Sequence, residues 1–196
     1  AQRTLASLAD VADARAAQAA TAEVLQVISS SVADAQPVLE KILESCGHLF
    51  NRPGMGVLLI GDDGQLHSAA SRSATALDPR SDWTMADSSA FLAKAQSVFP
   101  MPLAGTGTAA AIAAGRVLNF PDVLHGADVP RGVRAAALAS GRNYSQMMAP
   151  LMQGGRGIGS IVLIRPALGG FTDKEQDLLK TFADQAVIAI QNARLF

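Results

Sequence analysis

Two apolar segments joined by a pair of glycines constrain the fold of this chain more than any other feature. Residues 144–152 and 157–165 have the length and composition of strands, and the four residues between them, 153–156, contain Gly-Gly. Such a short glycine turn joins antiparallel neighbours. A second hairpin is predicted from strands at 55–60 and 66–71, which flank an Asp-Gly turn. Consecutive hairpins predict an antiparallel sheet.

Helical patterns flank this sheet on both sides. Residues 1 to about 31 contain no Gly or Pro, and their narrow Ala and Leu stripe predicts a helix that needs a partner helix, such as one from another copy. A second amphipathic helix is expected from Pro37 to Phe50. Thr172 and Glu175 form a capping-box pattern that opens a final helix, which is expected to continue beyond Phe196. The order of elements predicts an α+β layer arrangement.

The middle of the chain, from residue 72 to about 141, has the least periodicity and the most polar side chains. Short helices are expected near residues 88–96, 107–114 and 131–139, with short strands near 98–103 and 116–120. Loops and short helices carried on a firm sheet are typical of a region that encloses a ligand.

Composition excludes several classes of function. The net charge is −1 and Lys and Arg are scattered, which argues against nucleic-acid binding. The only cysteine, Cys46, excludes an intramolecular disulfide and a cysteine-based zinc cluster. No apolar run is long enough to span a bilayer and no signal-peptide pattern is present. We therefore expect a cytoplasmic domain without direct membrane contact, which leaves open a membrane-anchored parent protein.

Several segments resemble GAF domains of proteobacterial signalling proteins. The segments 22–31 and 36–39 are similar to the family's opening. The segments 158–165, 171–175 and 182–196 are very similar to its ending. Shorter matches lie at Gly115-Arg116-Val117 with Asp122-Val123 and at Gly141-Arg142 with Ala149-Pro150-Leu151. The resemblance covers roughly residues 21–196 and is weakest from about 72 to 114.

The resemblance implies an α+β, GAF-like (PAS-related) fold. Its antiparallel sheet of five to six strands would carry the N- and C-terminal helices on one face and a ligand pocket on the other. Residues 1–20 would be an N-terminal signalling helix, and residues 21–196 the GAF domain with a C-terminal helix continuing toward an output domain. The family further implies a homodimer formed through the terminal helices and a covalently linked output domain, often a histidine kinase or a cyclase. The alternative is a structural dimerisation or spacer module without a ligand.

The catalytic and chromophore-binding activities of the family are not expected here. Free-methionine-sulfoxide reductases of this fold need several cysteines, and this chain has one. Bilin sensors need a pocket cysteine beside a histidine, whereas Cys46 and His48 lie on the predicted second helix. Cyclic-nucleotide GAF domains carry an Asn-Lys pair ahead of the segment echoed by Phe171 and Glu175, and that pair is missing.

The candidate ligand-binding residues come from the irregular block and the first strand of the last hairpin. An Arg fork suits a carboxylate or phosphate, and residues two apart on a strand share one face. The set is Trp83, Asn119, Asp122, Arg131, Arg134, Arg142, Tyr144, Gln146 and Met148. Two alternatives stay open: Arg131 and Arg134 as solvated helix residues, and Trp83 as a loop-packing residue instead of a pocket lid. Which ligand or cofactor is bound is not indicated.

No catalytic or metal site is expected. His48, His67 and His125 lie on different predicted elements without metal-ligand spacing. The hydroxyls considered as nucleophiles have no nucleophile-elbow sequence around them: Ser68, Ser71, Thr106 and Ser145. A hydrolase or reductase on the same fold is the third and weakest hypothesis.

Overall fold

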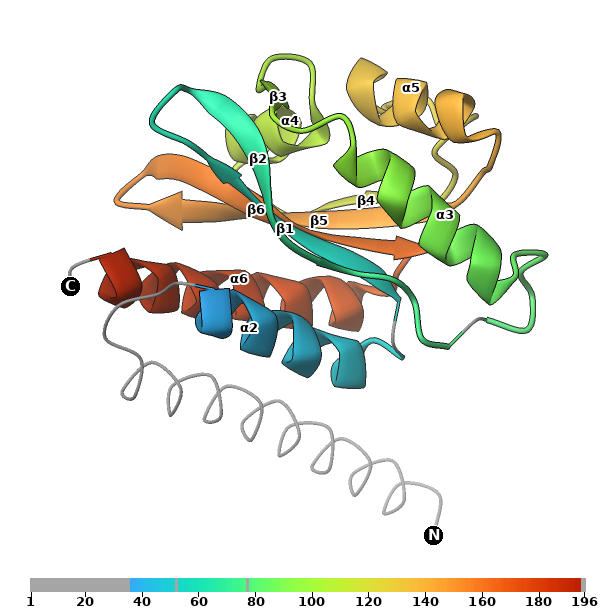
Figure 1. Ribbon diagram of the computed structural model, residues 1–196, viewed down its shortest axis with the longest axis horizontal. Helices are drawn as coiled ribbons and strands as arrows, with labels where there is room; N and C mark the ends of the chain where they lie inside the picture. Colours follow the sequence, from blue (N-terminus) through green and yellow to red (C-terminus); the bar gives the residue numbers. More distant parts are fainter. Residues whose placement is uncertain (1–35, 52, 77, 195–196) are drawn as a thin grey trace, which may run out of the picture.

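The computed structural model describes residues 36–51, 53–76 and 78–194 (Figure 1). The helix expected over residues 1 to about 31, including the proposed 1–20 segment, lies outside the described residues, as does Phe196. The elements follow one another as α2 (Gln36–Leu49), β1 (Gly54–Ile60), β2 (Gln65–Arg72), α3 (Met85–Gln96), β3 (Met101–Pro102), α4 (Gly107–Ala114), β4 (Leu118–Phe120), α5 (Arg131–Ser140), β5 (Ser145–Gln153), β6 (Arg156–Arg165) and α6 (Asp173–Arg194).

The strands form one six-stranded sheet in the order β3-β2-β1-β6-β5-β4, with antiparallel pairing throughout. Both hairpins predicted from the sequence are present. In the β5–β6 turn, Gly154 and Gly155 have φ of 56° and 81°, which residues with a side chain rarely adopt. Glycine at both positions therefore permits the tight turn that sets the register of β5 and β6.

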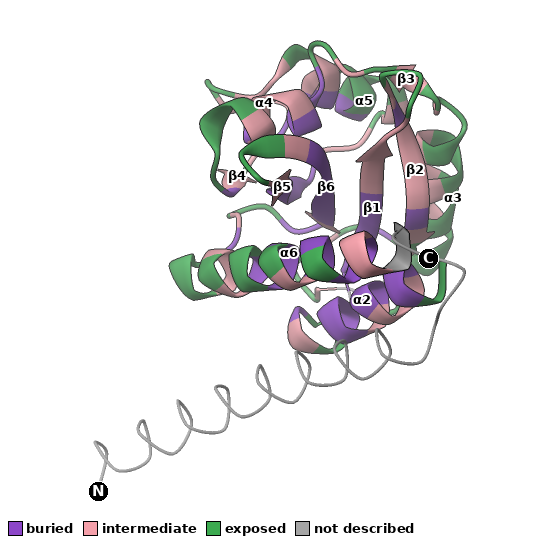
Figure 2. Ribbon diagram, turned by 90° about the vertical axis from the view of Figure 1, so that its left-hand side faces the viewer, coloured by how far each residue is buried: buried purple, intermediate pink, exposed green. Residues whose placement is uncertain are grey.

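One face of the sheet, here called the packed face, is covered by α2 and α6 (Figures 1 and 2). The apolar stripe of α6 places Leu179, Phe182 and Ile190 in a core with Ile42 and Leu43 of α2, and all are 1% exposed or less. The capping box predicted at the start of α6 is confirmed, because Glu175 accepts the Thr172 backbone N–H at 2.8 Å. The two helices therefore bury this face of the sheet in one apolar core.

The opposite face, here called the pocket face, carries the shorter helices α3, α4 and α5 (Figure 1). Helix α3 begins earlier than predicted, because Thr84 and Asp87 form a capping box ahead of Ser88. The strand predicted at 98–103 is reduced to β3, since Pro100 and Pro102 have no N–H to donate to a ladder. Among the described helices, none combines the length and apolar character needed to cross a bilayer.

Candidate ligand pocket

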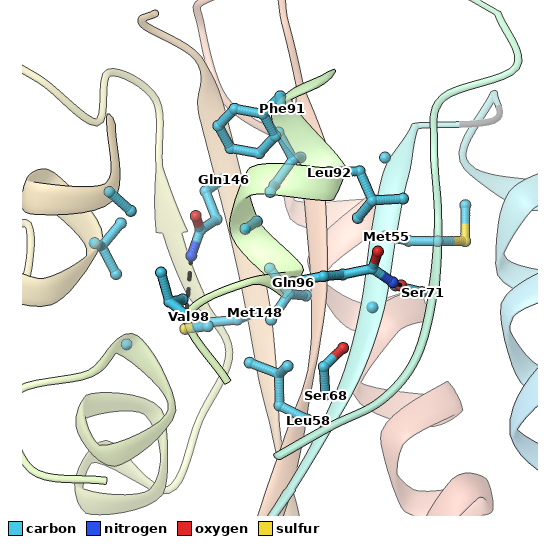
Figure 3. Close-up of a pocket in the computed structure, with 18 of the residues that line it drawn as sticks. Met55, Leu58, Ser68, Ser71, Phe91, Leu92, Gln96, Val98, Gln146 and Met148 are labelled. Atoms are coloured by element: carbon cyan, nitrogen blue, oxygen red, sulfur yellow. Dashed lines mark hydrogen bonds between the residues drawn. The ribbon is translucent and has the colours of Figure 1, made fainter. Parts of the chain in front are cut away.

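A cavity of about 200 Å³ lies between the pocket face and the helices above it (Figure 3). Leu58, Met148 and Val162 from the three central strands form its floor. Phe91 and Leu92 of α3 cover it. The pocket therefore lies on the side of the sheet away from α2 and α6, as the family resemblance implied.

An irregularity in β2 brings two serines to the same side of the sheet. The pairing of β1 with β2 shifts at Val57/Leu58, so that Ala69 has no partner. Side chains three residues apart on a regular strand point to opposite faces. Because of this bulge, Ser68 and Ser71 both line the pocket, while Ala70 packs into the core of the other face.

Three aromatic rings close one end of the pocket. The ring centroids of Trp83 and Phe91 are 5.3 Å apart, and those of Phe91 and Tyr144 are 5.1 Å apart with nearly perpendicular planes. Edge-to-face contacts of this kind are favourable for aromatic pairs. Burial raises the pKa of Tyr144, so its hydroxyl stays protonated at any physiological pH. The wall is therefore aromatic and uncharged.

Helix α4 approaches the sheet closely at its first turn. A Cβ at Gly107 would lie 2.6 Å from the Met148 sulfur, so a larger residue there would displace the Met148 side chain from its present position. The buried hydroxyls of Thr108 and Ser160 hydrogen bond to each other at 2.9 Å and join α4 to β6. These contacts fix the floor and the α4 side of the pocket relative to each other.

The pocket lining is almost without charge. Among the described residues that line it there is no Asp, Glu, His, Lys or Cys. Its one charged residue, Arg72, is exposed at the end of β2 and pairs with Glu40 at 3.6 Å. A charged ligand would have no counter-ion among these lining residues, whereas an uncharged ligand needs none.

Four of the candidate residues from the sequence line this pocket: Trp83, Tyr144, Gln146 and Met148. Gln146 and Met148 lie on the pocket side of β5 and Met147 between them packs in the core of the other face, while Tyr144 lines the pocket from just before the strand. Trp83 is 5% exposed and packs on Phe91, so it belongs to the wall. Whether these side chains contact a ligand stays a prediction.

The arginines do not line the pocket and have other partners. Arg142 pairs with Asp87 of α3 at 2.6 Å and lies 5.8 Å from the Trp83 ring centroid. Arg134 donates to the carbonyls of Leu124 and Gly126 and so holds the loop before α5. Arg131 is exposed at the first residue of α5. The sequence predicted that an arginine fork would bind the ligand. This prediction is wrong for this pocket, because none of the three arginines lines it.

Asn119 and Asp122 also lie outside the pocket. The Asn119 amide donates to the Phe171 carbonyl at 2.8 Å and accepts its N–H at 3.2 Å, which joins β4 to the start of α6. Asp122 accepts from the His125 N–H and from the Asn143 amide. Burial acts to raise the pKa of Asp122, but the hydrogen bonds from Asn143 and His125 outweigh it and hold the pKa below its usual range. Both side chains organise loops.

The histidines and the cysteine that were weighed for chemistry are not among the described residues that line this pocket. His67 pairs with Asp63 on the exposed end of the β1–β2 hairpin. Cys46 is fully buried in the packed-face core, where burial raises its pKa to about 12. No group of three potential metal ligands occurs within the part of the chain that the structure describes.

Sequence reasoning missed most of the apolar lining and one polar pair. Gln96 of α3 donates to the Ser71 hydroxyl at 2.5 Å, which connects the covering helix to the floor. Phe91, Leu92 and Met101 come from the weakly periodic block, where no pattern distinguished a lining residue from an exposed one. The capping-box pattern of Thr84 and Asp87 is the sequence signal that could have predicted where α3 begins.

Comparison with known proteins places this chain in a family. The model of the GAF domain matches residues 34–190. The chain belongs to the GAF domain family. No curated protein sequence matches the chain.

Solved structures share the GAF fold at low sequence identity. The GAF domain of a phosphoenolpyruvate-protein phosphotransferase from Coxiella burnetii superposes with a TM-score of 0.67 at 13% identity, covering 93% of this chain and 96% of that one. A domain assigned to a two-component sensor histidine kinase of Sinorhizobium meliloti gives 0.56 at 19%, with 81% and 91% covered. The free methionine-R-sulfoxide reductase of Neisseria meningitidis, solved with its substrate, gives 0.64 at 17%, with 91% and 90% covered. At these identities the likeness shows the fold alone.

Proposed function

We propose that this GAF domain is a non-catalytic sensory module that binds a small, largely apolar molecule in the pocket above the sheet. The observation that carries the proposal is the contrast between the two faces. One face is filled by α2 and α6, and the other encloses about 200 Å³ lined by apolar side chains. A mostly apolar cavity with a few polar groups is the usual form of a small-molecule site.

Strand β6 offers a route from the pocket to α6. Val162 and Ile164 line the pocket, whereas Leu163 between them packs in the core with α6. The next residue, Arg165, binds Glu175 in the first turn of α6 at 2.5 Å. A ligand that favours one position of β6 would therefore shift the position of α6, provided that it binds the two positions with different affinity.

We further propose that the signal leaves through a homodimer formed by the N- and C-terminal helices and reaches a covalently linked output domain. The sensor-kinase domain of Sinorhizobium meliloti supports an output of the histidine-kinase type, with a cyclase as the other family option. On the outer side of α6, Ile188 is 43% exposed, which leaves apolar surface for a second copy. Analytical ultracentrifugation of the chain tests the dimer, and a monomer at micromolar concentration would contradict it.

A catalytic role has less support. The reductase of Neisseria meningitidis shows that an enzyme can have this fold. Here the only cysteine is in the packed-face core, and the described pocket residues include no acid or base other than the exposed Arg72 and the buried Tyr144. The described pocket residues therefore include no thiol, and burial raises the pKa of the one internal acid–base group, Tyr144, so that it stays neutral.

A thermal-shift screen against a library of neutral metabolites tests ligand binding. A ligand at about 100 times its Kd stabilises the folded state by about 2.7 kcal/mol, which raises the midpoint measurably. The shift should disappear in Ser68→Leu, which fills the pocket, and persist in Ser89→Leu, the same change on the exposed side of α3. If no compound shifts the wild type, the result contradicts the proposal and favours the spacer alternative.

A further inference from the structure

One polar side chain in the pocket has no adequate partner in the protein. Gln146 is 5% exposed, and its amide extends into the pocket between Met148 and Val98 (Figure 3). Among the described residues, the one acceptor within hydrogen-bond reach of its Nε2 is the Met148 sulfur, 4.0 Å away. A thioether is a weak acceptor, so the carboxamide has unused capacity for hydrogen bonds.

Tyr144, two residues earlier and just before β5, is a second buried polar residue at this pocket. It is 1% exposed and lines the pocket, yet its hydroxyl has no hydrogen-bond partner among the described residues. Buried polar groups in native proteins are nearly always paired, because leaving them unpaired is costly. Two such groups at one cavity indicate that something other than the protein completes their hydrogen bonds.

The lining also limits the charge of the ligand. Thr106, Thr108, Ser68 and Ser71 can donate or accept, but no described residue within the cavity can neutralise a buried ion. Arg72 is exposed at the rim and paired with Glu40. Burying an unpaired carboxylate or ammonium is far more costly than burying a neutral polar group, so an ion is disfavoured.

We propose, resting on the ligand-binding function above, that the ligand is an uncharged ring-sized molecule with a carboxamide, lactam or similar edge that pairs with Gln146. A carboxamide offers one acceptor oxygen and two donor hydrogens. An edge that presents a carbonyl beside an N–H satisfies both kinds of group at once, through two parallel hydrogen bonds. The apolar remainder of the ligand lies between Leu58, Met148 and Phe91.

Four naphthalene probes of similar size test this edge: 2-naphthamide, 2-acetylnaphthalene, 2-isopropylnaphthalene and 2-naphthoate. They carry, in that order, an acceptor with donors, an acceptor alone, no polar group and a charge. Kd values are measured by calorimetry for the wild type, for Gln146→Met and for Met147→Leu. Met147 is the adjacent residue on β5 but packs in the opposite core, so its near-isosteric replacement is the matched control.

The preference for 2-naphthamide over 2-isopropylnaphthalene should fall about tenfold in Gln146→Met and stay unchanged in Met147→Leu. In the wild type, 2-acetylnaphthalene should bind several-fold more weakly than the amide, and 2-naphthoate at least about tenfold more weakly. The wild-type comparison of amide with ketone does not depend on the folding of any variant.

Three outcomes separate the two proposals. If the probes bind but the amide preference is the same in Gln146→Met, or is missing in the wild type, the role of Gln146 is overturned and the binding pocket stands. If 2-naphthoate binds best, the inference of an uncharged ligand is overturned. If neither these probes nor any library compound binds the wild type, the proposed function fails and this inference fails with it.

Discussion

The two faces of the sheet are built from the same strands but are filled in different ways. On β5, Met147 and Ala149 are fully buried against the α2 and α6 layer, while Gln146 and Met148 border a cavity. The difference comes from the helices. Helix α6 contributes seven residues between Leu179 and Ile190 to the packed-face core, whereas Ser88 is the one buried residue of the twelve in α3. Stability is thus concentrated on one face and open volume on the other.

The largest expected effect compares the same truncation on both faces. Leu163 on β6 is 0% exposed in the packed-face core, and Leu58 on β1 borders the pocket. Leu163→Ala should lower the free energy of unfolding by about 3 to 5 kcal/mol, because a tightly packed site cannot collapse around the lost atoms. Leu58→Ala should cost about 1 to 2 kcal/mol, because its surroundings already include open space. Urea unfolding followed by circular dichroism measures both, and equal losses would contradict the comparison.

Enlarging a side chain should reverse the sign between the faces. Ala149→Leu adds atoms to a site that is 0% exposed and filled, which should cost about 1 to 3 kcal/mol. Ser68→Leu places its atoms in the cavity and should stabilise the unliganded protein by about 1 kcal/mol. The same urea titration applies. Destabilisation by both substitutions would mean that the pocket closes in solution.

The packed face also predicts a pH dependence through Cys46. Burial favours the neutral thiol and raises its pKa from 9.0 to about 12. A raised pKa contributes stability below the unfolded-state value, and this contribution is lost as the pH rises from about 9 toward 12. The free energy of unfolding should therefore fall by roughly 1 kcal/mol between pH 9 and pH 10.

Cys46→Ala should remove most of this slope and leave the smaller part that the raised pKa of Tyr144 contributes, and a thiol reagent at pH 8 should modify the wild type only after unfolding. Rapid labelling of the native protein would show that the packed face is open at α2. A slope that persists undiminished in Cys46→Ala would assign it to another group.

The packed face could be predicted from the sequence because its signals are local and repeated. The three- and four-residue spacing of α6, the Thr172 capping box and the Gly154-Gly155 turn each fix an element without reference to the rest of the chain. The short elements were harder, since the two prolines near β3 end its ladder after two residues.

The pocket was only partly predictable. Alternation along β5 identified Tyr144, Gln146 and Met148, because a regular strand has period two. The bulge at Ala69 breaks that period, so sequence alone gave no reason to place Ser68 and Ser71 on one face.

The arginines show a different difficulty. The sequence indicates that an arginine prefers a carboxylate but not which one, and for Arg142 that carboxylate is Asp87 of the protein itself. Asp87 also accepts the Thr84 backbone N–H of the α3 capping box, and that contact, together with Arg142, holds its pKa below the usual range. Arg142 thus ties the covering helix to the strand side of the pocket.

This tie is the pocket-face counterpart of the Arg165–Glu175 pair that joins β6 to α6, and its removal should give the smallest effect. Arg142→Met should lower global stability by less than about 1 kcal/mol, since a partly exposed ion pair contributes little. Amide exchange in α3 should nevertheless accelerate several-fold while α6 is unchanged, because α3 has few other buried contacts. Arg165→Met should do the reverse, loosening the start of α6 and leaving α3 protected. If Arg142→Met leaves α3 exchange at the wild-type rate, α3 is held by its other contacts, such as the packing of Phe91 on Trp83 and the hydrogen bond from Gln96 to Ser71.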